Sequence, residues 1–186
     1  MSLGPHATAQ GGMPPWAVVS SVRAAHVGRV VTLLDAWAIA ADVGAAEHAR
    51  WVRAGWLHDA LRDATETALR ALLPSSTDPL PLLHGPAAAV RAAAEGEADD
   101  AVLEAVRWHT VGYTDWGQTG RALYAADFLE PGRPFAQEER AALAAAYPSD
   151  PSGVLREVVV MRAAHQLRKG RQEHPLSAAF RASVLA

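Results

Sequence analysis

The chain has 186 residues, of which 50% are hydrophobic and 20% are charged, and its formal net charge is −3. This length predicts one domain with a full hydrophobic core, and the composition excludes a chain that is disordered throughout. The small negative charge argues against a protein that coats nucleic acid. No apolar run reaches the ~18 residues that a membrane span requires, because Asp35 and Asp42 interrupt the best candidate, Val30–Ala46. We therefore expect neither a nucleic-acid partner nor a membrane partner.

Cysteine is absent, which excludes disulfides, thiolate metal ligands and cysteine nucleophiles. Any metal site must therefore use His, Asp and Glu side chains. Residues 1–14 are rich in Gly and Pro and contain no apolar core segment or secretory signal. We predict that they form a flexible tail, that residues 15–186 form the single domain, and that the protein is cytoplasmic.

Helical periodicity begins after Pro15, where Val18, Val22 and Leu33 share one stripe. We predict helices, in chain order, at residues 18–43, 46–61, 65–73, 86–95, 100–109, 118–129, 137–147, 154–169 and 176–185. A Pro-rich loop is predicted from Pro74 to Pro86, with Pro86 at the first position of the helix that follows. Because no alternating strand pattern of useful length occurs, the predicted fold class is all-α.

Six residues that can bind metal lie among apolar neighbours at or near helix ends or inside helices: His26, His58, Asp59, His84, His109 and Asp127. A buried carboxylate costs several kcal/mol unless it is paired or bound to a cation. Nitrogen and oxygen ligands together suit Fe, Mn, Co, Ni or Zn better than Mg. The alternative interpretation is structural: a core histidine, helix-end histidines that interact with the dipole, and Asp127 paired with Arg121 or Arg133.

Five segments carry these residues in an order that resembles the HD-domain metal phosphohydrolases, and within them the YqeK-type branch. The segments are Arg23–His26, Gly55–Asp59, Leu82–Pro86, Val106–Gly112 and Tyr124–Arg133. Gly170-Arg171 and His174-Pro175 also resemble the ending of that branch. The resemblance covers residues 18–185 and implies a single HD-domain helical bundle around a metal centre.

The resemblance also implies a ligand set. One metal ion would be bound by His26, His58, Asp59 and Asp127. A second ion, where present, would be bound by His84 and His109, with Asp59 bridging the two. Iron is the metal that the resemblance favours, with Mn, Co, Ni or Zn as alternatives.

The activity implied by the resemblance is the symmetric hydrolysis of diadenosine tetraphosphate to two ADP by metal-activated hydroxide. Asp59 and Arg62 would be the catalytic residues, with Arg62 standing where the family usually has Lys. Arg62 and Arg133 would bind phosphate, while Thr110 can offer a hydroxyl and Gly112 a backbone N–H to phosphate or base. The alternative for Arg62 is a salt bridge with Asp63 or Glu66, and for Arg133 a pair with Glu130.

The chain departs from the YqeK-type pattern in the Tyr113–Trp116 loop, where Tyr113 or Trp116 can stack on a purine or pack against the helices. This departure leaves other nucleotide substrates open: guanine nucleotides, alarmones or nucleoside monophosphates. A metal- and nucleotide-binding sensor with little turnover, or a metal-free helical scaffold, are alternatives of another class. YqeK-type proteins are also linked by name to NAD metabolism, but no Gly-rich dinucleotide loop follows a strand here. We expect a small nucleotide as partner, and the last two helices allow a homodimer.

Overall fold

The computed structural model describes residues 12–186, so residues 1–11 of the predicted tail lie outside the described part. Within residues 12–186 the chain forms helices and no strand, which confirms the predicted all-α fold class. The helices are α1 Ser21–Ala40, α2 Ala45–Leu57, α3 Glu66–Leu72, α4 Leu80–Ala94, α5 Asp100–Trp108, α6 Gln118–Leu129, α7 Gln137–Ala146, α8 Pro151–Arg168 and α9 Pro175–Leu185. None of them is long and apolar enough to cross a membrane.

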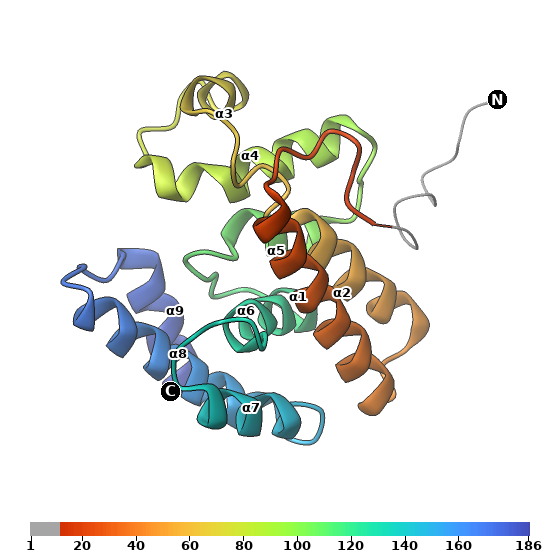
Figure 1. Cartoon of the computed structure of the whole chain (residues 1–186), viewed down its shortest axis with the longest axis vertical. Helices are drawn as coiled ribbons and strands as arrows, with labels where there is room; N and C mark the ends of the chain where they lie inside the picture. Colours follow the sequence, from red (N-terminus) through yellow and green to blue (C-terminus); the bar gives the residue numbers. More distant parts are fainter. Residues whose placement is uncertain (1–11) are drawn as a thin grey trace.

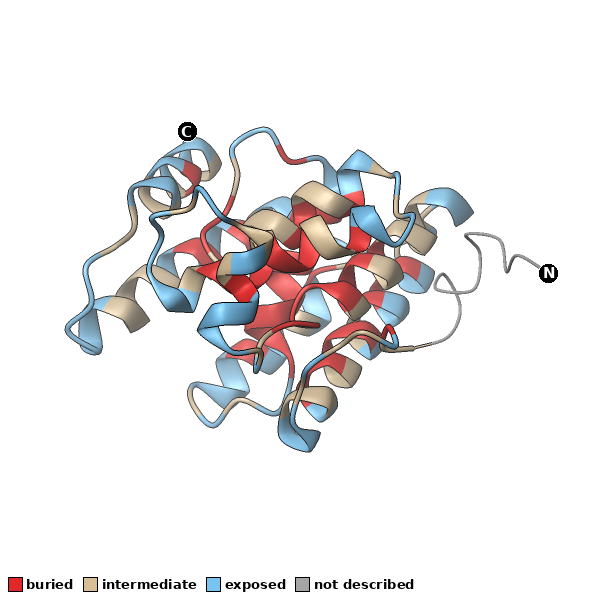
Figure 2. Cartoon of the chain, turned by 90° about the horizontal axis from the view of Figure 1, so that it is seen from above, coloured by how far each residue is buried: buried red, intermediate tan, exposed pale blue. Residues whose placement is uncertain are grey.

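Helix α6 lies at the centre of the molecule, between α3 and α4 at one end and α7, α8 and α9 at the other (Figure 1). Ten of its residues are buried, so α6 is enclosed on nearly all sides. Figure 2 shows the buried residues gathered in the middle of the bundle, with exposed residues on the outer helix faces. A residue on α6 can therefore face side chains from several other helices.

Side-chain caps explain where several helices begin. Ser20 accepts a hydrogen bond from Arg23 N at the start of α1, and Asp99 accepts one from Ala101 N at the start of α5. Thr65 caps α3 in the same way.

Two predicted boundaries are wrong by four residues or more, and three others, the two ends of α1 and the start of α8, differ from the prediction by three residues. Helix α2 ends at Leu57 rather than Leu61, and residues 58–63 form turns. Helix α4 begins at Leu80 rather than Pro86, so that the second half of the predicted loop is helical. Pro86 therefore lies inside α4 and removes one helical N–H donor, a cost that the packing of the surrounding helix offsets. His84 consequently lies within a helix, not at the end of a loop.

Gly85 sets the close approach of α4 to the end of α5. A Cβ at this position would lie 2.9 Å from Val106 O and 3.0 Å from Arg107 O, which are backbone atoms that cannot swing aside. The same Cβ would lie 3.1 Å from His109 Cε1. The absence of a side chain at Gly85 thus brings His84 and His109 together.

We expect Gly85→Ala to lower the free energy of unfolding by about 1–3 kcal/mol, because α4 and α5 must separate to admit the methyl group. Chemical denaturation would measure the change. Gly28→Ala in α1 is the matched control, because a Cβ there meets no atom within 4 Å. That variant should instead raise the free energy of unfolding by about 1 kcal/mol through helix propensity. Equal stability of Gly85→Ala and the parent chain would contradict the close packing.

Candidate metal centre

The six predicted metal ligands come from five separate parts of the fold. His26 lies in α1, His84 in α4 and Asp127 in α6, while His58 and His109 are the residues that follow α2 and α5. Asp59 follows His58 directly. All six side chains are buried.

Asp59 lies at the centre of the cluster, with two imidazole rings facing each of its carboxylate oxygens. Oδ1 is 3.2 Å from His84 Nε2 and 3.6 Å from His109 Nε2. Oδ2 is 3.6 Å from His26 Nε2 and 3.6 Å from His58 Nε2. Among the described residues, His26, His58 and Asp59 form one group whose ligand atoms lie within 4.8 Å of one another, and Asp59, His84 and His109 form a second. Asp59 is thus the residue that the two groups share.

Hydrogen bonds at Nδ1 orient three of the four imidazole rings. His58 Nδ1 lies 2.7 Å from Gly55 O, and His109 Nδ1 lies 2.8 Å from Val106 O. His26 Nδ1 lies 3.1 Å from Glu130 Oε1. Because these acceptors are oxygens, each Nδ1–H donates, and Nε2 is the ring nitrogen that faces Asp59.

The Nε2 atoms provide the test of whether a metal fits. His26 Nε2 and His58 Nε2 are buried and make no hydrogen bond to any residue in the described range. Buried polar atoms without partners are costly, and here both nitrogens face the carboxylate that they share. The residues therefore fit a divalent cation held by imidazole nitrogen and carboxylate oxygen.

The charges around Asp59 and Asp127 keep both carboxyl groups ionised. Burial raises the pKa of Asp59, but electrostatic attraction to His58 and contacts with His109 and His84 outweigh burial and hold that pKa well below its usual range. Burial likewise raises the pKa of Asp127, and the charges of Arg133, Arg162 and the nearby His26 reverse the effect. The cluster therefore contains two ionised, buried carboxylates.

The pKa values of two histidines shift in opposite directions in this environment. Burial lowers the pKa of His58 to about 4, so the ring stays neutral and keeps a lone pair for a ligand bond. Burial also lowers the pKa of His26, but the contacts with Asp127 and Glu130 and the charges of Asp127 and Asp59 outweigh burial and raise that pKa to about 9. Positive charge is therefore favoured where the His26 ring faces the two aspartates.

Asp127 lies at the edge of the cluster, among arginines. Its Oδ1 is 3.2 Å from His26 Nε2 and 2.6 Å from Arg133 Nη2, and its Oδ2 is 3.3 Å from Arg162 Nη1. The predicted structural pairing of Asp127 with Arg133 is thus present, while the alternative partner Arg121 donates instead to Trp116 O.

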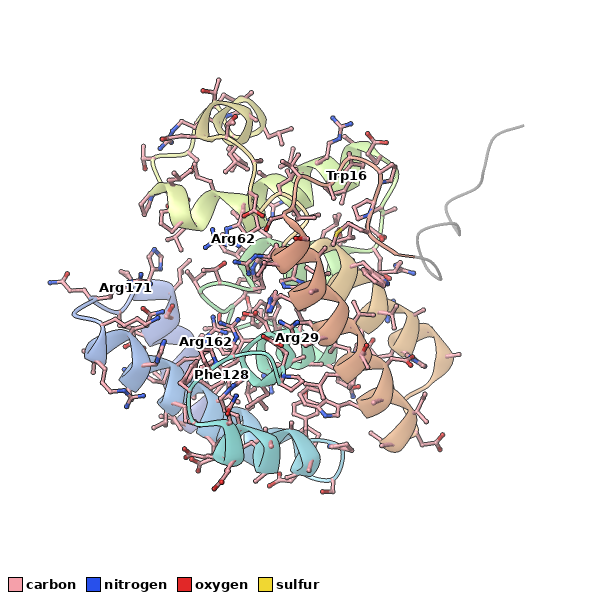
Figure 3. The ribbon with its side chains drawn as sticks, in the orientation of Figure 1. Trp16, Arg29, Arg62, Phe128, Arg162 and Arg171 are labelled. Carbon is pink, nitrogen blue, oxygen red and sulfur yellow. The ribbon has the colours of Figure 1, made fainter. Side chains whose placement is uncertain are left out.

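The four predicted substrate-binding residues lie in different settings. Arg62 lines a small cavity beside His84 and makes no ion pair within residues 12–186, and its side chain is labelled in Figure 3. Thr110 Oγ1 lies 3.3 Å from His109 Nε2. Arg133 binds Asp127, as described above. Gly112 differs: its N–H donates to Trp108 O at 2.8 Å, and a side chain there would collide with Phe180, so the predicted phosphate contact of Gly112 lacks a free donor.

The alternative salt bridges predicted for Arg62 do not form. Asp63 instead accepts a hydrogen bond from Ser20 N at 2.7 Å, and Glu66 pairs with Arg70. Both carboxylates are therefore used elsewhere, which leaves the Arg62 guanidinium available to a ligand.

The sequence left open whether Tyr113 and Trp116 stack on a purine or pack against the helices, and the packing decides this for Trp116. Trp116 is buried against Tyr124 and Phe180, so it belongs to the core. Tyr113 is less buried and stacks on Trp108, with ring centroids 5.9 Å apart.

Three residues of the site escaped the sequence prediction. Glu130 is 1% exposed and contacts His26, Arg23 Nη1 lies 2.8 Å from Asp59 Oδ2, and Arg162 contacts Asp127. Arg23 and Glu130 lie inside segments that carry the family resemblance, and Glu130 follows the apolar pair Phe128-Leu129, which is the signal that could have revealed it. Nothing in the pattern of α8 distinguishes Arg162.

Comparison with known proteins identifies the fold. No family model matches the chain. A solved structure from Clostridium acetobutylicum, described as a predicted HD superfamily hydrolase involved in NAD metabolism, aligns with a TM-score of 0.76 at 22% identity, over 90% of each chain. The symmetrical bis(5'-nucleosyl)-tetraphosphatase of Staphylococcus aureus is 40% identical over 53 residues, which are 28% of this chain and 27% of that protein. The matched segment thus spans about a quarter of the curated relative. The chain therefore has the HD fold, with a buried cluster of His and Asp side chains at its centre.

Proposed function

We propose that the protein is a metal-dependent phosphohydrolase that cleaves diadenosine tetraphosphate symmetrically to two ADP. The observation that carries the proposal is the Asp59 carboxylate, which faces two imidazoles at each of its oxygens. The similarity of one segment to a symmetrical bis(5'-nucleosyl)-tetraphosphatase supports the choice of substrate.

His26, His58 and Asp59 would hold one ion, with Asp127 beside them, and Asp59, His84 and His109 would hold a second. Iron is the metal we propose, with Mn, Co, Ni or Zn as alternatives, since imidazole nitrogens outnumber carboxylate oxygens in both groups. When bound, such ions lower the pKa of coordinated water and neutralise phosphate charge. The chain's own residues would then bind and orient the phosphates.

The arginines supply the positive charge that a tetraphosphate needs. Arg62 has a guanidinium that no described residue pairs with, and Arg23, Arg133 and Arg162 lie around the two aspartates. Figure 3 shows Arg62 and Arg162 on the two sides of the space between α4 and α8. Guanidinium groups bind phosphate oxygens through two parallel hydrogen bonds, which fixes the phosphate chain for in-line attack by water.

Symmetric cleavage breaks the bridge between the two central phosphates. Water adds to one inner phosphorus, and the other half of the molecule leaves as ADP. Because a nucleoside diphosphate is a good leaving group, no strong general acid has to face the departing oxygen.

The experiment is product analysis with the full chain. The protein would be incubated with diadenosine tetraphosphate and Fe(II), Mn(II) or Co(II), under anaerobic conditions for iron, and the nucleotides separated by ion exchange. ADP as sole product, abolished by a chelator, is the expected result. AMP plus ATP would contradict symmetric cleavage, and no product with any metal would contradict the choice of substrate.

We expect Arg62→Ala to lower kcat/KM for diadenosine tetraphosphate about 10–100-fold, the loss that follows removal of a hydrogen bond to a charged group. Arg62→Lys should recover part of the loss, because a single positive charge remains but the paired hydrogen bonds do not. Arg168→Ala, at an exposed position on α8, is the control and should leave kcat/KM unchanged. An Arg62→Ala variant with the parent's kcat/KM would show that this side chain does not touch the phosphates.

A further inference from the structure

A small cavity lies directly beside the metal-ligand cluster, between the turn that follows Asp59 and helices α3 and α4. Its volume is about 190 Å³, and the residues that line it are Arg62, Ala64, Leu69, Leu80, Pro81 and His84. We call it the α3–α4 slot. A larger hollow, of about 580 Å³, lies near Asp42 and Glu47 but is lined by none of the candidate ligands.

The slot has one polar end and one apolar end. Ala64, Leu69, Leu80 and Pro81 contribute only apolar side chains, while Arg62 and His84 provide the polar groups. Leu69 is buried, whereas Leu80 is 43% exposed although it is a large aliphatic residue. An apolar wall that opens to solvent beside a guanidinium fits a ligand with an apolar body and an anionic end.

His84 connects the slot to the cluster. One side of its ring lines the slot, and its Nε2 lies 3.2 Å from Asp59 Oδ1. A ligand with phosphates at Arg62 and at the ions that Asp59 would hold would therefore have its next group at the slot entrance. In a nucleotide that group is the nucleoside.

The volume limits which part of a nucleotide can enter. Sites for drug-sized molecules have roughly 300–1,000 Å³, and the slot, at about 190 Å³, has room for a single ring system only. A nucleobase is flat and has two apolar faces, so contact with Leu80 and Pro81 would remove it from water.

We propose that the α3–α4 slot binds one nucleobase of the substrate, with Arg62 on the phosphates of the same nucleotide. This inference rests on the proposed function, because it places one half of a dinucleoside polyphosphate relative to the cluster. The apolar side chains of the slot offer no hydrogen-bonding group, so recognition there depends on contact area rather than on the edge of the base.

The test fills the slot without touching a candidate ligand. Leu80 is the first residue of α4 and is partly exposed, so Leu80→Trp adds an indole at the apolar wall with little effect on folding. Leu176→Trp is the matched control, since Leu176 lies near the start of α9 and is 41% exposed. Both variants should melt within a few degrees of the parent chain.

Binding of ADP and of inorganic pyrophosphate to the Mn(II)-loaded protein would be measured by titration calorimetry. We expect the parent chain to bind ADP more tightly than pyrophosphate. Leu80→Trp should weaken ADP binding about tenfold, the loss of one base contact, and leave pyrophosphate binding unchanged. Leu176→Trp should alter neither. For diadenosine tetraphosphate, Leu80→Trp should raise KM by a similar factor.

Any of three results would contradict nucleobase binding in the slot. They are equal binding of ADP and pyrophosphate by the parent chain, unchanged ADP binding in Leu80→Trp, or an equal weakening of ADP and pyrophosphate binding in Leu80→Trp. The outcome is separable from that of the proposed function. If diadenosine tetraphosphate is hydrolysed and Leu80→Trp has no effect, only the proposal for the slot is contradicted. If Leu80→Trp weakens the binding of ADP but diadenosine tetraphosphate is not hydrolysed, only the proposed reaction is contradicted.

Discussion

Asp59→Ala is expected to abolish both metal retention and the hydrolysis of diadenosine tetraphosphate. Asp59 is the carboxylate that the two ligand groups share, so its removal takes an oxygen ligand from both at once. Loss of a single transition-state hydrogen bond costs about 10²–10³ in rate, and loss of a shared ligand should cost more. Product formation would be followed by ion exchange, and bound metal would be measured by elemental analysis.

Asp59→Asn and Asp35→Ala complete this experiment. Asparagine preserves the shape of Asp59 but not its charge, so Asp59→Asn should also lose metal if charge is what holds the ion. Asp35 is exposed and pairs with His48 away from the cluster, and Asp35→Ala should keep full activity. Full activity in Asp59→Ala would contradict the assignment of the metal centre.

Glu130→Gln is expected to weaken metal binding about 10–100-fold, the usual effect of altering a carboxylate that orients a histidine ligand. Glu130 Oε1 lies 3.1 Å from His26 Nδ1, and Oε2 accepts hydrogen bonds from Arg29 Nε at 2.5 Å and from Gly132 N at 2.7 Å. The negative charge favours a His26 ring that donates at Nδ1 and offers its Nε2 lone pair. A neutral amide provides less of this bias, so the metal affinity falls.

The measurement is a competition titration of Mn(II) or Co(II) against a chelator of known affinity. Glu47→Gln is the matched control, because Glu47 is also a carboxylate with several hydrogen bonds, from Thr119, Trp51 and Arg50, but lies at the opposite end of α2 from His58. It should lower stability without changing metal affinity. Unchanged affinity in Glu130→Gln would show that Glu130 only holds Arg29 and the loop that follows α6.

Arg140 explains why that loop is in place to present Glu130 and Arg133. Its guanidinium is buried and donates hydrogen bonds to the carbonyl oxygens of Phe128, Glu130 and Arg133. A fully buried arginine is rare unless its donors are satisfied, and here backbone oxygens satisfy them. The loop after α6 is therefore held from α7, a helix that contributes no candidate ligand.

Much of the fold could be predicted from local patterns. The central helix, Gln118–Leu129, has the predicted bounds, because its apolar residues and the Gly117 before it act locally. The predicted start of α4 was wrong because Pro86 was assigned to the first turn. Local rules favour that position for proline, but contacts of α4 with α3 and α5 extend the helix to Leu80. Packing energy from distant residues thus outweighed the preference of one residue.

The sequence by itself determined which residues could bind a metal. The lack of cysteine restricts ligands to His, Asp and Glu, and the resemblance of their order to that of the HD-domain metal phosphohydrolases implies a shared site. Only the tertiary structure decided how they are used. His26 and Glu130 are 104 positions apart, and the α3–α4 slot joins side chains from a turn and two helices. Such contacts depend on how helices pack, and the periodicity of a single helix carries no information about the partner that it will face.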